Sequence, residues 1–166
     1  SAEGSGIGFW SNPVLYAPPE KKMNVILVME DALRADHLSC YGYHRKTTPV
    51  KDEWASKGVL FQNAYSQATY TKASTAYLMT SLYPSATGVL NYIDILHENY
   101  LTMAEILRSQ GFATGSFIQN DFTGPAGNMH QGFNNVFDGE TTGGLANTIY
   151  DGKSFKNWLD QNSDRN

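Results

Sequence analysis

The stretch FQNAYSQATYTKASTAYLMTSLYPSATGV, residues 61–89, gives the strongest indication of the fold and of a possible site. A short β-like run, Val59 to Ala64, leads through hydroxyl-bearing residues into an apolar-periodic segment that Pro84 ends. This order predicts a strand, a loop and a helix from about Ala73 to Leu82. The hydroxyls therefore fall at a helix N-terminus, where free backbone N–H groups and the positive dipole end favour an anionic group. They belong to Ser66, Thr69, Thr71, Ser74 and Thr75.

Two interpretations of these hydroxyls stand side by side. One of them is a nucleophile that attacks a phosphate or sulfate ester at the helix start. The other is structural, because Ser and Thr are preferred N-caps, and Thr71 or Ser74 can satisfy N–H groups of the first turn. The local pattern alone favours capping.

Composition limits the classes of function. The chain has 166 residues, 41% of them apolar, which suffices for one globular core. Its net charge is −4 and it has no long basic run, so the sequence lacks the basic segments that are typical of nucleic-acid-binding proteins. Cys40 is the only cysteine, which excludes an internal disulfide. No apolar run approaches the ~20 residues of a membrane span.

The first strand is predicted at Asn24 to Met29, a continuous apolar run typical of a central parallel strand. Residues 1–22, rich in Gly and Pro, are expected to form an irregular leader, and residues 23–166 to form the N-terminal part of one α/β domain. Glu30 and Asp31 follow the strand at its carboxyl end, where α/β sheets bind ligands. Asp31 is therefore a candidate metal ligand, and the alternative is a loop carboxylate that caps the next turn.

Two helices are predicted from their ends. Thr48 and Pro49 fit the N-cap and first position of a helix that ends at Gly58, with Val50 and Trp54 on its buried face. The spacing of Thr102 and Glu105 predicts a capping box, and the helix that follows ends at Gly111.

The C-terminal third predicts one more strand and one more helix. The strand covers Ala113 to Ile118 and leads into Asn120, and the Gly-rich sequence from Thr123 to Asn147 is expected to be a long loop. The helix runs from about Asp151 to Gln161, and its expected buried face holds Phe155, Trp158 and Leu159.

Strands and helices alternate along the chain, so we predict an α/β fold with a mostly parallel sheet and helices on both faces. With three clear strands and a helix at its end, the sheet is expected to be incomplete in this chain.

Several ordered motifs resemble one known family. They are NVILVMEDALRADHLSCYGY (24–43), TTP (47–49), FQNAYSQ (61–67), LYP (82–84), LTMAEIL (101–107), QGFAT (110–114) and QGF (131–133). In this order and spacing they resemble the N-terminal part of the sulfatases, members of the alkaline phosphatase superfamily. The resemblance covers most of residues 24–138 and implies that family's fold.

The resemblance implies roles for particular residues. Asp31 matches the first acidic metal ligand of the family, while the second acidic position is Ala32. Thr71-Lys72-Ala73-Ser74-Thr75 stands where sulfatases have Cys/Ser-x-Pro-Ser-Arg, whose first residue becomes formylglycine. Thr cannot be converted in this way. Other branches of the superfamily use Thr at this place as both nucleophile and metal ligand, so Thr71 is the expected catalytic residue.

Substrate contacts differ from the family pattern as well. The sulfatase Lys-x-His aligns with Gln119 and Asp121. We therefore assign substrate binding to Lys72, next to the nucleophile, and to Asn120. The alternative for Lys72 is a solvated lysine of the first helical turn, and for Asn120 a turn at the strand end.

The expected function is hydrolysis of sulfate or phosphate esters, assisted by a divalent cation (Ca, Mn, Mg or Zn) held by Asp31 and Thr71. The alternatives are a phosphotransferase that acts on lipid or glycan head groups and a non-catalytic binding domain. A metal takes four to eight ligands, so a C-terminal half is expected to complete the site. The family also implies an extracytoplasmic location.

Overall fold

The structure, a computed structural model, describes residues 24–118, 120–138 and 153–163. The leader expected at residues 1–22 lies outside them. The described residues divide into two compact units: Val25–Ser66, and a larger one that contains Asn24 and the described residues from Gln67 onward. Within the described ranges, no helix is long and apolar enough to cross a bilayer.

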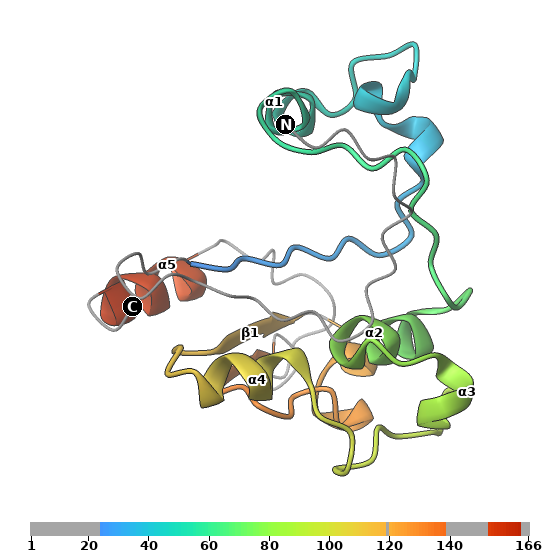
Figure 1. The fold of residues 1–166 in the computed structure, drawn as a ribbon. Coiled ribbons are helices and arrows are strands. Elements are labelled where there is room, and N and C mark those ends of the chain that lie inside the picture. Colours follow the sequence, from blue (N-terminus) through green and yellow to red (C-terminus); the bar gives the residue numbers. More distant parts are fainter. Residues whose placement is uncertain (1–23, 119, 139–152, 164–166) are drawn as a thin grey trace, which may run out of the picture. The chain divides into compact units, whose positions relative to one another are not determined.

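The smaller unit contains α1 (Pro49–Lys57) after two short 3-10 turns, η1 (Ala35–His37) and η2 (Ser39–Tyr41) (Figure 1). The predicted bounds of α1 are confirmed: Thr48 occupies the N-cap, Pro49 begins the helix and Gly58 follows it. The Thr48 hydroxyl does not cap the backbone. It accepts the N–H of Ser39 at 3.1 Å and donates to the Asp52 carboxylate at 3.2 Å. Side-chain hydrogen bonds thus connect η2 to α1.

The predicted buried face of α1 is wrong. Val50 and Trp54 share one side of the helix, but Trp54 remains 65% exposed. Helical spacing brings two apolar residues to one face, whereas burial requires a second apolar surface against that face. None of the described residues of this unit supplies one.

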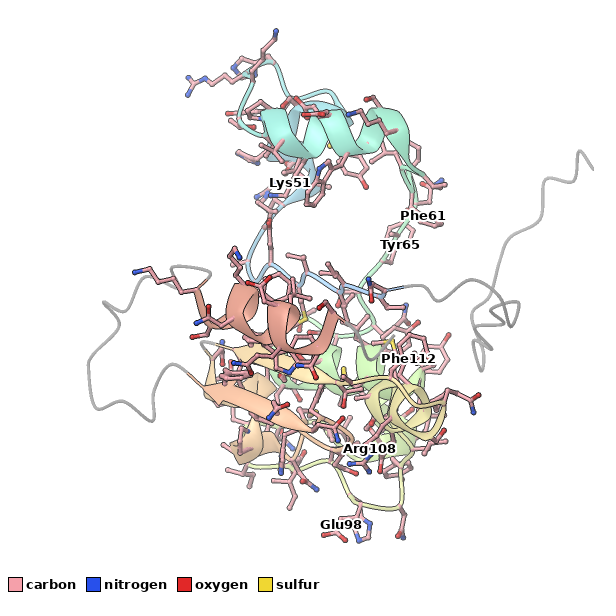
Figure 2. The ribbon with its side chains drawn as sticks, turned by 90° about the vertical axis from the view of Figure 1, so that its left-hand side faces the viewer. Lys51, Phe61, Tyr65, Glu98, Arg108 and Phe112 are labelled. Atoms are coloured by element: carbon pink, nitrogen blue, oxygen red, sulfur yellow. The ribbon has the colours of Figure 1, made fainter. Side chains whose placement is uncertain are left out.

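Two predicted strands of this unit are also wrong. Residues 24–29 and 59–64 form no strand in the described part of the chain. The side chains from Val25 to Met29 are all exposed, and Figure 2 shows Phe61 and Tyr65 along the segment that follows α1. A strand requires a neighbour to pair its N–H and C=O groups, and neither run has such a neighbour among the described residues.

The larger unit holds the other helices and a parallel pair of strands. Strand β1 (Gly115–Ile118) confirms the strand predicted at 113–118, and it pairs with β2 (Asn135–Asp138), Phe117 opposite Phe137. The parallel pairing and the surrounding helices agree with the α/β class. A larger sheet covered on both faces stays a prediction. The helices are α2 (Thr71–Thr80), α3 (Pro84–Thr87), α4 (Met103–Ser109) and α5 (Lys153–Asn162), with 3-10 turns η3 (Asp121–Thr123) and η4 (Pro125–Gly127).

Strand β2 lies inside the segment predicted to be a loop. Its four residues are too few to show alternation, and its place is fixed by β1. Phe137 stacks on Phe117 with ring centroids 4.6 Å apart, and Phe155 and Trp158 of α5 meet Phe117 edge-on. The predicted inward face of α5 therefore packs on the strand pair, half-buried rather than fully buried. Residues 151–152 of the predicted helix lie outside the described residues.

The core of the larger unit consists of Ala76, Val89, Leu96 and Met129. The predicted capping box of α4 is confirmed, since Thr102 and Glu105 exchange side-chain-to-backbone hydrogen bonds. The buried Thr102 hydroxyl also donates to the Gln131 carbonyl at 2.9 Å. This contact joins the start of α4 to the segment that carries Met129.

Candidate functional site

Thr71 is the first residue of α2, two residues before the predicted start of this helix. Tyr70 occupies the N-cap, so Thr71 is not the capping residue. Ser74 is not a cap either, because its hydroxyl donates to the carbonyls of Tyr70 and Thr71, each at 3.0 Å. Thr71 therefore lies in the first turn, whose N–H groups have no partner within the helix.

Lys72 points into the protein. Its side chain is only 3% exposed, and Nζ donates to the carbonyl of Tyr92 at 2.7 Å. A Cβ on Gly127 would lie 3.1 Å from Cε of Lys72, so the lysine stem passes directly over this glycine. The interpretation of Lys72 as a solvated lysine is wrong, because its ammonium group fastens the 90–94 segment to the first turn of α2.

Asn120 organises a turn after β1. Its Oδ1 accepts the backbone N–H of Phe122 at 2.9 Å, and its carbonyl accepts the Thr123 hydroxyl at 2.8 Å. The turn that it forms, η3, contacts α2. Asn120 and Thr71 thus belong to elements of one unit that pack against each other.

Asp31 lies in the smaller unit, on an exposed turn. Its Oδ1 accepts the N–H of Ala32 at 2.9 Å, and Ala32 has φ of +56°, a left-handed conformation that is rare for residues other than glycine. The backbone therefore turns sharply after the carboxylate. Asp31 and Thr71 belong to separate units, so their convergence on one cation stays a prediction.

The described residues fit a metal ion only in part. Carboxylate oxygen is a suitable ligand for Ca²⁺ or Mg²⁺, and Asp31 offers one. No group of three His, Cys, Asp or Glu side chains comes together within the described ranges. Zinc takes about four ligands and calcium six to eight, so Asp31 and Thr71 alone would leave the coordination incomplete.

Asp94 controls the shape of the 90–94 segment. Its Oδ2 accepts the backbone N–H groups of Leu90 and Asn91 at 2.7 and 2.6 Å. These two bonds hold the pKa of the Asp94 carboxyl below its usual value, and the charge of Lys72 acts in the same direction. Sequence reasoning missed Asp94. The only signal for it was an acidic residue inside an apolar run.

Tyr70 and Tyr92 were missed as well. The Tyr70 hydroxyl is buried and has no hydrogen-bond partner among the described residues. Burial raises the pKa of Tyr70, and the charge of Asp94 adds to the effect. The Tyr92 ring contacts the Tyr70 ring with centroids 5.4 Å apart. No periodic pattern relates these tyrosines, so their contact could not be read from the sequence.

Comparison with known proteins gives a consistent result. The sulfatase family model matches residues 23–164. An N-acetylgalactosamine-6-O-sulfatase of Bacteroides thetaiotaomicron is 37% identical over 100 residues, which is 57% of this chain and 20% of that protein. Human arylsulfatase A is 31% identical over 120 residues, or 66% of this chain and 24% of its own. A mouse iduronate 2-sulfatase is 31% identical over 97 residues, which is 57% of this chain and 17% of that protein.

The chain thus spans about a fifth of the length of these relatives. No solved structure matches it significantly. The family model nevertheless covers most of the chain, including the segments that carry Asp31, Thr71 and Asn120. The chain belongs to the sulfatase family.

Proposed function

We propose that the protein to which this chain belongs hydrolyses sulfate or phosphate esters and that Thr71 is its nucleophile. The relatives are named sulfatases, which supports ester hydrolysis. The observation that carries the assignment is the position of Thr71 as first residue of α2. N–H donors of a first helical turn can bind the equatorial oxygens of a sulfuryl or phosphoryl group as charge develops on them.

The reaction follows from the chemistry of a hydroxyl group. Oγ1 of Thr71 attacks sulfur or phosphorus, the bond to the ester oxygen breaks, and the alcohol leaves with a proton. Water then attacks the sulfated or phosphorylated threonine and releases the inorganic anion. The proposal requires no formylglycine, which threonine cannot form.

A threonine hydroxyl is a weak nucleophile at neutral pH and must be activated. A divalent cation (Ca, Mn, Mg or Zn), when bound, lowers the pKa of such a hydroxyl and neutralises charge on the transferred group. The relationship to the sulfatases supports the proposal of such an ion. We assign Asp31 and Thr71 as two of its ligands, and polypeptide outside this chain as the source of the others.

Two further residues are assigned to substrate binding. Lys72 places a buried positive charge next to Thr71, while its ammonium is bonded to Tyr92. Asn120 contributes its amide from the turn that packs on α2. The same family relationship underlies the extracytoplasmic location that we propose.

The test is turnover of 4-nitrophenyl sulfate and 4-nitrophenyl phosphate by the full-length protein. We expect Thr71→Ala to lower kcat at least about 1000-fold, since loss of a nucleophile removes the covalent route. Thr71→Ser should retain part of the activity. Ser74→Ala is the matched control, because this hydroxyl lies in the same turn but serves the backbone. Turnover that survives Thr71→Ala would exclude the assignment.

Two other functions are outcomes of the same experiment. If an added acceptor alcohol appears in the product as its phosphate ester, the protein is a phosphotransferase. If the wild-type protein neither turns over these esters nor retains a divalent cation after reconstitution, it is a non-catalytic binding domain.

A further inference from the structure

Lys72 is connected to a backbone turn that lies 20 residues further along the chain. Its side chain is 3% exposed, and Nζ donates to the carbonyl of Tyr92 at 2.7 Å. Burial of an ammonium group is strongly unfavourable unless acceptors replace the water that it loses. The bond to Tyr92 therefore fixes the place where the lysine side chain ends.

The stem of Lys72 is confined as well. Gly127 leaves room for it, because a Cβ at this position would lie 3.1 Å from Cε of Lys72 and 3.0 Å from the carbonyl oxygen of Phe122. The Gly127 carbonyl accepts the N–H of Leu96 at 3.0 Å, so the backbone that borders the stem is hydrogen-bonded in turn. Lys72 thus follows a defined path from α2 to the Tyr92 carbonyl.

Asp94 gives the turn around Tyr92 its shape. Its Oδ2 accepts the backbone N–H groups of Leu90 and Asn91 at 2.7 and 2.6 Å. Tyr92 lies between these donors and their acceptor, so the two bonds close the backbone around it. The opposite charges of Asp94 and Lys72 also attract each other. The carboxylate therefore holds the turn that presents the Tyr92 carbonyl to the lysine.

The first turn of α2 gains support from this arrangement. The first N–H groups of a helix have no partner within it, and helix ends fray. Tyr70, the N-cap residue, places its ring against the Tyr92 ring with centroids 5.4 Å apart, and Lys72 reaches the Tyr92 carbonyl. Tyr70 and Lys72 are the covalent neighbours of Thr71. Their contacts therefore limit the movement of Thr71 through the backbone.

We infer that Asp94 is a positioning residue for the reaction, which acts through the shape of its turn and through Lys72 on the alignment of Thr71. The inference rests on the proposed function, because it takes Thr71 as the nucleophile. Attack on sulfur or phosphorus requires Oγ1 to lie in line with the ester oxygen that leaves, and a displacement of about 1 Å can slow such a step about 100-fold.

The test is a double-mutant cycle in the full-length protein, with 4-nitrophenyl sulfate and 4-nitrophenyl phosphate as substrates. Asp94→Ala opens the turn, and we expect it to lower kcat about 10-fold. Lys72→Met keeps the stem but removes the ammonium group, and it should lower kcat by at least as much. In the Lys72→Met background, Asp94→Ala should then change kcat less than about 2-fold, because the bond through which it acts is already missing.

This coupling distinguishes positioning from a loss of stability. If Asp94→Ala only reduced the folded fraction, it would lower kcat by the same factor in both backgrounds. Asp94→Asn is the conservative variant: its amide oxygen can accept both N–H groups of the turn, so it should restore most of the lost kcat.

Two further variants complete the design. Asp94→Glu keeps the charge but displaces the acceptor by one methylene, so the same cycle can be measured with it if Asp94→Ala does not fold. Asp160→Ala is the matched control, because Asp160 also pairs with a lysine, Lys156 at 2.6 Å, but on the exposed surface of α5. It should leave kcat unchanged in both backgrounds.

The inference is overturned if substitution of Asp94 by Ala or Glu leaves kcat unchanged, if it lowers kcat by the same factor in the Lys72→Met background, or if Asp94→Asn loses as much as Asp94→Ala. Its failure can be told from failure of the proposed function. In the first case Thr71→Ala still abolishes turnover, and in the second it does not.

Discussion

The two units of the chain are stabilised in different ways. In Val25–Ser66, Leu38 is the one buried hydrophobic residue described, and side-chain hydrogen bonds such as Ser39 to Asp52 at 2.6 Å connect its elements. The larger unit has a contiguous core formed by Ala76, Val89, Leu96 and Met129.

The difference shows that apolar sequence alone does not make a core. The run from Val25 to Met29 is the most continuous apolar stretch of the smaller unit, and it is exposed throughout. The core residues of the larger unit come from scattered positions that α2 and the following loops bring together. Matched substitutions in the two units should therefore have unequal effects.

Gly132→Ala should have the largest effect on stability. Gly132 has φ of +90°, and an added Cβ would collide with the backbone of Ala104 and Glu105. We expect a loss of at least about 3 kcal/mol in the free energy of unfolding, measured with urea. Gly42→Ala is the control in the smaller unit: its φ is +92° with open space around it, so about 1 kcal/mol is expected. Equal losses would show that the collision is relieved by a backbone shift.

Leu96→Ala tests the core directly. Leu96 is fully buried, so truncation should cost about 2–5 kcal/mol of unfolding free energy through lost transfer energy and a cavity. Val28→Ala removes a side chain that is 65% exposed and should change the free energy by less than about 0.5 kcal/mol. A comparable loss in Val28→Ala would break the comparison, because it would mean that residues 25–29 pack in a sheet.

Thr102→Val should lower the free energy of unfolding by about 1–2 kcal/mol. The substitution preserves shape but removes a cap and leaves the Gln131 carbonyl without its donor. Thr48→Val, at the N-cap of α1, should cost less, because this hydroxyl is only half-buried and does not bond to the helix backbone. Thermal unfolding of the two variants, followed by circular dichroism, gives the order. A larger effect at Thr48 would contradict it.

The smallest predicted effect is a pH dependence at Asp94. Folding lowers the pKa of this carboxyl, so its contribution to stability is complete above the unfolded value of about 4 and is lost as the pH falls through the lower folded value. The melting temperatures of wild type and Asp94→Asn should therefore differ at pH 7 and converge below about pH 4. A difference that is constant with pH would contradict this.

Salt should distinguish Asp94 from Asp36 of the smaller unit. The hydrogen bond from Arg34 is the main cause that lowers the pKa of Asp36, the hydrogen bond with His37 comes next, and the charges of both groups act in the same direction. The side chains of Arg34 and Asp36 are both exposed, so 1 M salt should screen the attraction between their charges. Backbone N–H groups are the main cause at Asp94, and the effect there should persist in salt.

The features that depend on only a few neighbouring residues, such as helix ends, could be predicted from the sequence. The bounds of α1 follow from Thr48, Pro49 and Gly58, and the start of α4 follows from the pairing of Thr102 with Glu105. The position of Thr71 near the start of a helix was predicted from local sequence in the same way. In each case capping groups and allowed dihedral angles act over three or four residues, so the sequence carries the whole signal.

The sequence by itself thus determined the family, the bounds of α1, the start of α4 and the candidate nucleophile. Only the tertiary structure decided that Lys72 bonds to Tyr92, 20 residues away, and that Tyr92 meets Phe122. It also decided that residues 24–29 have no strand partner within the described ranges, while residues 135–138 have one. The physical reason is that burial and strand pairing depend on a partner surface, and residues distant in the chain supply that surface.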